Sequence, residues 1–158
     1  MEQLVDSNQQ KLKMDEIIKI AAKNTKSKYT FNQVYLSIMK ELTMAGSIVI
    51  QLGNTIFLVH RSEKNPRYAM MRGLNADTPQ NYLKNSEEFA QIAYQKYNID
   101  VIVSQYTDPT LNNIFAYVGR NKPQDMGFNI SKLPNDEGFE ATAKLGPLRG
   151  PVTAEGAA

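Results

Sequence analysis

Residues 47–74 read SIVIQL-GN-TIFLVH-RSEKNPR-YAMMRGL, and they are the most informative part of the sequence about its architecture. It holds three apolar runs, the first two of which are joined by Gly53 and Asn54. Both of these residues tolerate positive φ, so the pair favours a two-residue hairpin turn. Apolar side chains fall on both faces of the runs, and we therefore expect helices to cover both faces. The stretch predicts an antiparallel meander at the centre of an α+β domain.

Two helices are predicted before the meander. The first spans Asp15–Asn24, where isoleucines and alanines recur at helical spacing. The second spans Phe31–Ala45 and begins after Thr30, with Gln33 three places later. A threonine and a glutamine at this spacing are typical of a capping box, in which each side chain accepts from the backbone amide of the other residue.

Helices and strands alternate after the meander. A helix is predicted from Pro79, with a second helix start at Ser86 because two glutamates follow it. A strand is predicted over residues 100–106, a helix over 109–120 and a last strand over 127–133. A helix that leads from one strand to the next favours a parallel strand pair. The predicted sheet is therefore mixed, with an antiparallel meander followed by a helix-strand-helix-strand succession.

The composition of the two ends differs from that of the middle. Residues 1–13 are polar, and we expect a flexible N-terminus there. Residues 134–158 are rich in glycine, proline and alanine, and we expect a flexible tail because they bury little apolar surface. A single domain is predicted over residues 14–133.

Composition also excludes several kinds of chemistry. The 158 residues carry 18 basic and 16 acidic side chains, a balance that argues against a nucleic-acid partner. No apolar run approaches the length of a membrane span, so no membrane is predicted as a partner. There is no cysteine, and His60 is the only histidine, so no metal site is predicted. We expect a cytoplasmic protein, or one in a particle assembled in the cytoplasm, such as a virion.

The order of predicted elements resembles the GCN5-related N-acetyltransferase (GNAT) fold, over roughly residues 15–133. In that family two helices precede an antiparallel meander, and a strand then leads through a phosphate-binding loop into a helix, a strand, a helix and a closing strand. The late segment 112–120 (NNIFAYVGR), with Gly127 and Phe128 after it, resembles the family's late helix. The resemblance implies the fold and makes acetyl-CoA the cofactor to test.

The loop that binds the coenzyme diphosphate in this family has the pattern (Gln/Arg)-x-x-Gly-x-(Gly/Ala), and its backbone amides face the phosphates. The equivalent stretch here, 72–79, reads RGLNADTP. Pro79 donates no amide, and Asp77 places a negative charge where the phosphates would lie. We therefore expect a degenerate site without a cofactor. If acetyl-CoA does bind, the expected contacts are given by four residues: Arg72, Gly73, Asn75 and Thr78. The alternative is an ordinary strand end followed by a helix cap.

Few side chains suit acyl transfer. His60 ends a predicted strand and is the candidate general base, because histidine side chains exchange protons near neutral pH. Tyr117, or else Tyr106, would be the acid that protonates the leaving thiolate, by the resemblance. The alternative for each is a structural role, because the sequence shows no partner near His60 and holds eight tyrosines.

Two hypotheses follow, and whether the chain is an enzyme stays open between them. The first is a non-catalytic GNAT-like domain, of a kind at home in phage genomes, that serves as a structural or interaction module. It would have a protein partner, and an uncovered sheet edge would allow a homo-oligomer. The second is an acyl-CoA-dependent N-acetyltransferase with a divergent phosphate loop, in which an amine attacks the thioester directly.

Overall fold

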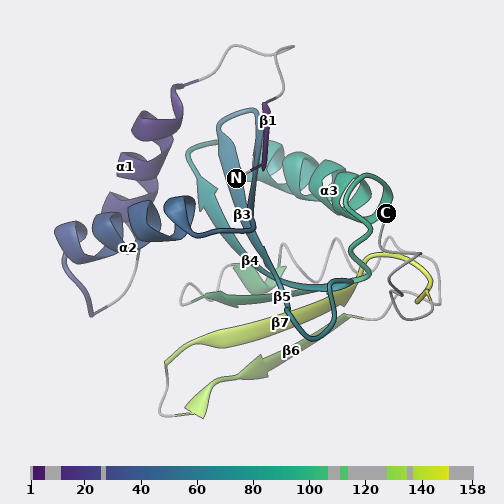
Figure 1. Cartoon of the computed structure of the whole chain (residues 1–158). Helices are drawn as coiled ribbons and strands as arrows, with labels where there is room; N and C mark the ends of the chain where they lie inside the picture. Colours follow the sequence, from purple (N-terminus) through teal and green to yellow (C-terminus); the bar gives the residue numbers. More distant parts are fainter. Residues whose placement is uncertain are drawn as a thin grey trace. The chain divides into compact units, whose positions relative to one another are not determined.

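The computed structural model describes residues 2–5, 12–25, 28–106, 111–113, 128–134 and 137–149. Its elements along the chain are β1 (Glu2–Val5), α1 (Met14–Asn24), α2 (Phe31–Thr43), β2 (Ser47–Leu52), β3 (Thr55–Arg61), β4 (Tyr68–Asn75), α3 (Pro79–Gln95), β5 (Val101–Tyr106), β6 (Phe128–Lys132) and β7 (Phe139–Lys144). The strands follow the order β1-β2-β3-β4-β5-β7-β6 in a mixed sheet (Figure 1). The predicted α+β class is confirmed, and so is the predicted succession of elements from α1 to β5.

The chain gathers into two compact units where the sequence predicts one domain over residues 14–133. Unit 1 comprises Met1–Val59 and Arg72–Phe89, and unit 2 comprises His60–Met71 and Ala90–Ala158. Three elements contribute residues to both units: β3, β4 and α3. Helical and strand periodicity predicts elements, but it carries no information on which elements share a core, so this division was not visible in the sequence.

The N-terminal helices of unit 1 begin where the sequence places them. Thr30 Oγ1 accepts from the amide of Gln33 at 3.2 Å, and Gln33 Oε1 accepts from the amide of Thr30 at 2.9 Å. This is the predicted capping box, and it satisfies two of the amides that every helix start leaves open. The helix α2 ends at Thr43, two residues before the predicted end at Ala45.

The hairpin between β2 and β3 also follows the prediction. Gly53 adopts a φ of +58°, whereas Asn54 does not adopt positive φ. A positive φ at the first turn position alone is typical of a type II′ turn, for which glycine carries no steric penalty. The glycine is therefore the residue that this turn requires.

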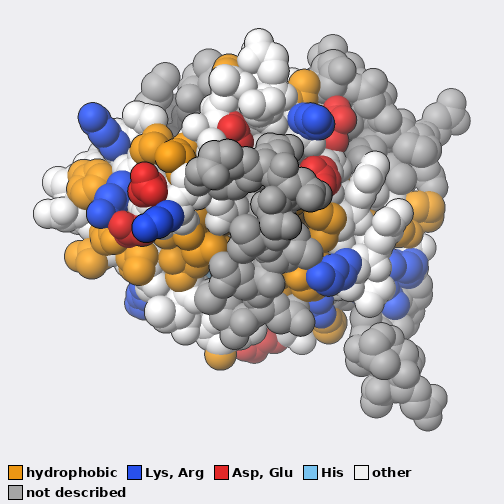
Figure 2. All heavy atoms as spheres, turned by 90° about the horizontal axis from the view of Figure 1, so that it is seen from above, with side chains coloured by type: hydrophobic (Ala, Val, Ile, Leu, Met, Phe, Trp, Pro, Cys, Tyr) orange, Lys and Arg blue, Asp and Glu red, His pale blue; other side chains and the backbone are white. Residues whose placement is uncertain are grey.

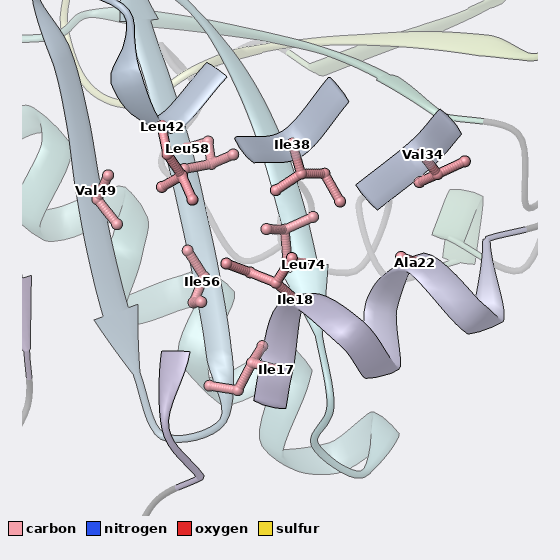
Figure 3. Packing of buried hydrophobic residues seen from close by; sticks show 10 residues of the cluster. All are labelled: Ile17, Ile18, Ala22, Val34, Ile38, Leu42, Val49, Ile56, Leu58 and Leu74. Carbon is pink, nitrogen blue, oxygen red and sulfur yellow. The ribbon is translucent and has the colours of Figure 1, made fainter. Parts of the chain in front are cut away.

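The face of the unit 1 sheet that α1 and α2 cover holds a dense apolar cluster (Figure 3). Its buried members come from both helices and from β2, β3 and β4: Ile17, Ile18, Ala22, Val34, Ile38, Leu42, Val49, Ile56, Leu58 and Leu74. On the strand β3, Ile56 and Leu58 point into this cluster, so Phe57 points to the opposite face. There the ring of Phe57 stacks on that of Phe89 from α3, with centroids 4.3 Å apart. The expectation that both faces of the meander are covered is thus confirmed for unit 1.

The helix α3 is continuous, so the predicted second helix start at Ser86 is wrong. The Ser86 hydroxyl donates to the carbonyl oxygen of Tyr82 at 2.8 Å, one turn earlier. A serine that bonds back in this way does not cap a new helix. The actual start is at Pro79, as predicted, and Asn98 with a φ of +56° lies just beyond the end of α3.

Unit 2 contains the predicted parallel pair and a region that the sequence did not predict. The strand β5 runs parallel to the first part of β4, with Tyr68 opposite Val101. On its other side β5 pairs antiparallel with β7, and β7 pairs antiparallel with β6. The core of this unit includes Ala93 and Ile99, which are fully or almost fully buried.

Two predictions of flexible ends are corrected by strands. Residues 1–13 contain β1, which pairs parallel with β2, and residues 134–158 contain β7. Both strands owe their place to backbone hydrogen bonds with a neighbouring strand, which side-chain composition does not reveal. In β7 only Ala141 is buried, so the strand has little of the apolar bulk that marks a core strand. The helix predicted over 109–120 is described only at residues 111–113, which are helical.

Several large apolar side chains of unit 1 stay exposed. They lie in or beside α2: Tyr29, Phe31, Leu36 and Met44. Leu36 is 65% exposed, and the ring of Phe31 stacks on that of Tyr35. Figure 2 shows hydrophobic side chains interspersed with charged ones on the side where α1 and α2 lie in Figure 1. Within the described ranges, no helix has the length and apolar character needed to cross a bilayer.

Candidate functional site

The candidate site is the turn between β4 and α3 in unit 1, where the family resemblance places the coenzyme loop. Asn75 ends the strand and its side chain folds the turn. Asn75 Oδ1 accepts from the amide of Asp77 at 3.0 Å and from Thr55 Oγ1 at 2.8 Å, while Asn75 Nδ2 donates to the carbonyl oxygen of Asp77 at 3.0 Å. This asparagine-led turn has the geometry of an Asx turn.

The carboxylate of Asp77 is the centre of the turn. Its Oδ2 accepts from the Asn54 amide at 2.7 Å and from Asn85 Nδ2 at 2.9 Å, and Thr55 Oγ1 lies 3.4 Å away. Thr55 and Asn85 are buried, whereas Asp77 is partly exposed. We call these residues, with Asn75, the Asp77 cluster. It ties the hairpin turn to α3 and places a negative charge near the positive end of the helix, where it is favourable.

The backbone amides of this turn are largely engaged by the chain itself. The amide of Ala76 donates to the Asn54 carbonyl oxygen at 2.9 Å, and that of Asp77 donates to the Asn75 side chain. The amide of Asn81 donates to Thr78 Oγ1 at 3.3 Å, and Pro79 has no amide hydrogen. These positions therefore offer few of the open donors that a diphosphate needs.

The four predicted coenzyme contacts do not converge on one point. Asn75 and Thr78 lie at the turn, where Thr78 caps α3 and is exposed. The guanidinium of Arg72 pairs with Glu41 of α2 at 2.7 Å. Gly73 lies within β4 and does not adopt positive φ. The helix-cap alternative for Thr78 agrees with this geometry, and the role of all four residues in binding a coenzyme stays a prediction.

Of the candidate acids and base for acyl transfer, the structure describes His60 and Tyr106 but not Tyr117. His60 lies near the end of β3 in unit 2 and is partly buried, and Tyr117 lies outside the described residues. The Tyr106 hydroxyl donates to Asn112 Oδ1, and its ring stacks on that of Phe139 with centroids 5.7 Å apart. Burial raises the pKa of Tyr106, which makes it a weaker acid than an exposed tyrosine. In the part of the chain that is described, no group of three or more His, Asp or Glu side chains is placed to hold a metal ion.

Three members of the Asp77 cluster were not predicted as site residues: Asn54, Thr55 and Asn85. Asn54 was assigned to the turn only, and its second role depends on a residue 23 positions away. Asn85 lies eight residues after Asp77. Helical periodicity does not predict that the two meet, because α3 begins between them. A buried polar residue on a helix is a signal that it has a partner, but only the fold shows which one.

No protein-family model and no curated protein sequence matches this chain. Solved structures of similar arrangement include a chimera of the spermidine N-acetyltransferase SpeG from Vibrio cholerae and hSSAT, with 9% identity and a TM-score of 0.47 over 85% of this chain and 91% of that one. A GNAT-family acetyltransferase from Bacillus anthracis has 10% identity and a TM-score of 0.45, with coverage of 82% and 81%. A ribosomal-protein-S5-alanine acetyltransferase from Vibrio fischeri has 8% identity and a TM-score of 0.45, with coverage of 84% and 89%.

Replacing Asp77 by alanine is expected to lower the free energy of unfolding by about 1–3 kcal/mol, because the backbone amide of Asn54 and one N–H of the buried Asn85 side chain lose their acceptor, while the other Asn85 N–H keeps Thr55 Oγ1. Urea denaturation followed by far-UV circular dichroism measures this change. Asp77→Asn keeps an oxygen acceptor in the same place and is expected to cost less. Asp15→Ala is a matched control, because it removes an exposed carboxylate that contacts Lys19 and the Tyr35 hydroxyl in water, and it is expected to cost clearly less than Asp77→Ala. Equal losses for Asp77→Ala and Asp15→Ala would contradict the anchoring role of Asp77.

Proposed function

We propose that this chain is a GNAT-like domain that does not use acyl-CoA and that serves as a structural or interaction module. The observation that carries the proposal is the carboxylate of Asp77, which occupies the β4–α3 turn and takes hydrogen bonds from Asn54 and Asn85. A coenzyme diphosphate at this turn would meet a fixed negative charge.

Two features of the turn support this proposal. The amides of Ala76 and Asp77 already have acceptors within the chain, so binding a diphosphate there would first break these hydrogen bonds. The arginine that would pair with a phosphate, Arg72, is held by Glu41. Both features lower the affinity expected for any polyanion at this turn.

The exposed apolar side chains beside α2 support an interaction role. Leu36 and Tyr29 are each more than half exposed, and large exposed apolar side chains are a feature of surfaces that contact other molecules. The surface beside α2 thus has the exposed apolar side chains that a binding module needs. The β4–α3 turn offers few of the open amides that an acyl-CoA-dependent transferase needs.

Acetyl-CoA is expected to leave the melting temperature of the protein unchanged at millimolar concentration. A ligand that binds only the folded state must raise the melting temperature, and at a hundred times its Kd it adds about 2.7 kcal/mol of stability. The measurement is a thermal-shift titration with acetyl-CoA, run beside inorganic phosphate at equal ionic strength.

A rise that acetyl-CoA produces and phosphate does not would contradict the proposal and favour an N-acyltransferase. In that case Asp77→Ser should strengthen the rise, because it removes the negative charge from the turn. The phosphate arm is needed to separate recognition of the coenzyme from a general response of basic side chains to phosphate groups.

A further inference from the structure

The strand β6 lies at an edge of the sheet. Among the described strands it is the last in the order, and it pairs with β7 alone (Figure 1). Its pairing with β7 is one-to-one from Phe128 to Lys132, so these positions contain no bulge. Asn129, Ser131 and Lys132 are exposed, and Ile130 is partly buried. The side of β6 that faces away from β7 is therefore a candidate for pairing with a further strand.

The hydrogen bonds between β6 and β7 decide which backbone groups of β6 point away from β7. The amide of Leu133 donates to the carbonyl oxygen of Gly138 at 2.8 Å, so these two residues form a hydrogen-bonded pair of the antiparallel ladder. In such a ladder, hydrogen-bonded and non-hydrogen-bonded pairs alternate. Residues 131 and 129 therefore bond to β7, whereas the amides and carbonyl oxygens of residues 128, 130 and 132 point outward.

The strand β6 has few of the features by which proteins keep an edge strand from pairing. Such features are a proline, a bulge, a charged side chain within the strand, or a very short strand. The sequence of β6 contains no proline, and its 5 residues are a usual length for a strand. Lys132, at the last position, is its only charged residue. A further strand can therefore pair along this edge if it places no second positive charge opposite Lys132.

We propose that β6 pairs antiparallel with β6 of a second copy of this chain, about a two-fold axis at Ile130. In this register Ile130 lies opposite the partner's Ile130, and residue 128 lies opposite the partner's Lys132. Every outward amide of one strand then faces an outward carbonyl oxygen of the other. The sheet continues from unit 2 of one copy into unit 2 of the other.

The sequence of β6 favours a second copy because this register is self-complementary. The two copies of Lys132 stay apart, and Asn129 lies opposite the partner's Ser131, which brings two polar side chains together. The same contact serves both chains, as a closed two-fold dimer requires. The net charge of the chain is only +2, so two copies repel each other weakly. This interface lies in unit 2 and does not depend on the function proposed for the β4–α3 turn of unit 1.

The first test compares two substitutions at Ile130 by sedimentation velocity, from micromolar to near-millimolar concentrations of the full chain. The wild type is expected to change from monomer to dimer as its concentration rises. Ile130→Pro removes the outward amide, and an edge strand tolerates proline where the nitrogen faces away from the ladder. This variant is expected to dimerise about tenfold more weakly or worse, because each dimer loses two hydrogen bonds. Ile130→Ala is the matched control, which keeps the amide and is expected to dimerise more tightly than Ile130→Pro.

Disulfide formation tests the register, because the chain has no cysteine of its own. Ile130→Cys places two thiols opposite each other at the axis, where Cα atoms about 5.5 Å apart suit a disulfide. Lys132→Cys is the matched control, because its two copies are four positions out of register, or about 13 Å apart, which is too far for a disulfide. In a glutathione redox buffer, Ile130→Cys is expected to form a covalent dimer and Lys132→Cys to stay largely monomeric on a non-reducing gel.

A wild type that stays monomeric at every concentration would overturn the proposal, and so would equal dimerisation of Ile130→Pro and Ile130→Ala. Equal crosslinking of the two cysteine variants would also overturn it, because the two-fold axis would then not lie at residue 130. Far-UV circular dichroism of each variant checks that the fold is kept. If Ile130→Pro unfolds, the cysteine variants decide the question, since neither of them removes a backbone amide.

Discussion

Phe57→Ala is expected to lower the free energy of unfolding by about 4 kcal/mol, within the usual range for a buried phenylalanine. The side chain of Phe57 is fully buried in unit 1, and its ring stacks on that of Phe89 at 4.3 Å. The substitution loses the transfer free energy of the ring and leaves a cavity between the sheet and α3. A stacked aromatic pair also contributes about 0.5–1.5 kcal/mol beyond its buried area, and this contribution disappears as well.

The matched control is Phe31→Ala. Phe31 is also an aromatic residue of unit 1 with a stacked neighbour, Tyr35, but it is 44% exposed. Water fills the space that its ring leaves, so the expected loss is under about 1 kcal/mol. Urea denaturation of both variants by far-UV circular dichroism measures the difference. Similar losses would mean that Phe57 does not belong to the core that holds α3 on the sheet.

Arg149→Met is expected to lower the free energy of unfolding by about 3 kcal/mol, because it leaves a buried carboxylate without its cation. Asp100 loses the ion pair with the guanidinium of Arg149, and only the backbone amide of residue 149 remains as a donor from that residue. Methionine keeps the length of the side chain, so the loss reports on charge and hydrogen bonding more than on packing. The value lies at the lower end for buried pairs because the Arg149 side chain is 28% exposed.

The double variant with Asp100→Asn separates this explanation from a general loss of packing. If the unpaired charge is the cause, Asp100→Asn in the Arg149→Met background restores part of the stability, because no buried charge is left. Lys144→Met is the control for removal of one exposed positive charge from the same unit, with an expected change within about 0.5 kcal/mol. A double variant no more stable than Arg149→Met would argue that the ion pair is not the source of the loss.

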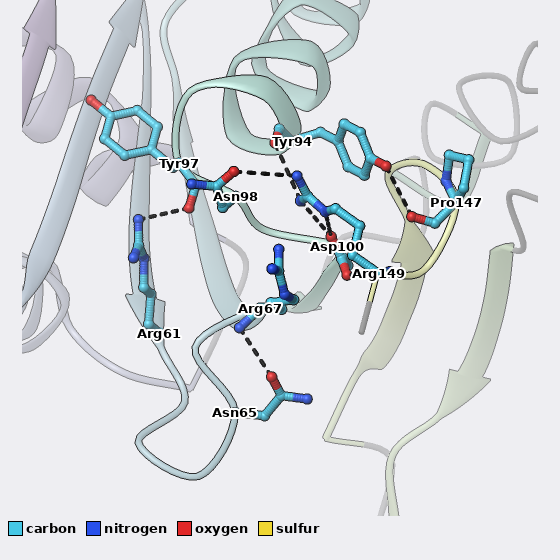
Figure 4. A network of polar contacts seen from close by, with 9 residues as sticks. All are labelled: Arg61, Asn65, Arg67, Tyr94, Tyr97, Asn98, Asp100, Pro147 and Arg149. Atoms are coloured by element: carbon cyan, nitrogen blue, oxygen red, sulfur yellow. Dashed lines mark hydrogen bonds and ion pairs between the residues drawn. The ribbon is translucent and has the colours of Figure 1, made fainter. Parts of the chain in front are cut away.

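The Asp100 interactions also explain why the C-terminal stretch holds its place. The amide of Leu145 donates to the Asp100 carbonyl oxygen at 2.8 Å, and the Tyr94 hydroxyl donates to the Pro147 carbonyl oxygen at 2.9 Å. A Cβ added to Gly146 would lie 2.5 Å from atoms of the Tyr94 ring, so this close approach requires glycine. In the sequence, the glycines and prolines of this stretch are signs of a flexible tail. In the structure, Gly146 and Pro147 let the chain pack closely on Tyr94 of α3 (Figure 4).

The prediction from sequence succeeded where the signal is local. The capping box at Thr30 and the Gly53 turn were predicted because each depends on residues a few positions apart. The limits of β2, β3 and β4 followed from runs of apolar residues ended by turn residues. It failed at β1 and β7, whose pairing depends on backbone groups of distant strands, and at Ser86, where a cap residue bonds backward within a helix.

The candidate site was predicted in part for the same reason. The family pattern pointed to the stretch from Arg72 to Thr78, and the charge of Asp77 was seen to oppose phosphate binding. The partners of Asp77 could not be predicted, because Asn54 and Asn85 come from a hairpin turn and a helix that meet only in the folded chain. Tyr117 as acid and His60 as base stay predictions.

Local sequence signals set the type and succession of most elements, because helix caps, turn residues and the spacing of apolar side chains act over a few residues. Tertiary structure alone decided which polar groups meet: Asp77 with Asn85 and Asn54 in unit 1, and Asp100 with Arg149 in unit 2. Such contacts join residues from 8 to 49 positions apart. The hydrogen-bond donors that surround a buried carboxylate depend on which elements pack against it. That packing is set by the whole fold and not by neighbouring residues in the sequence.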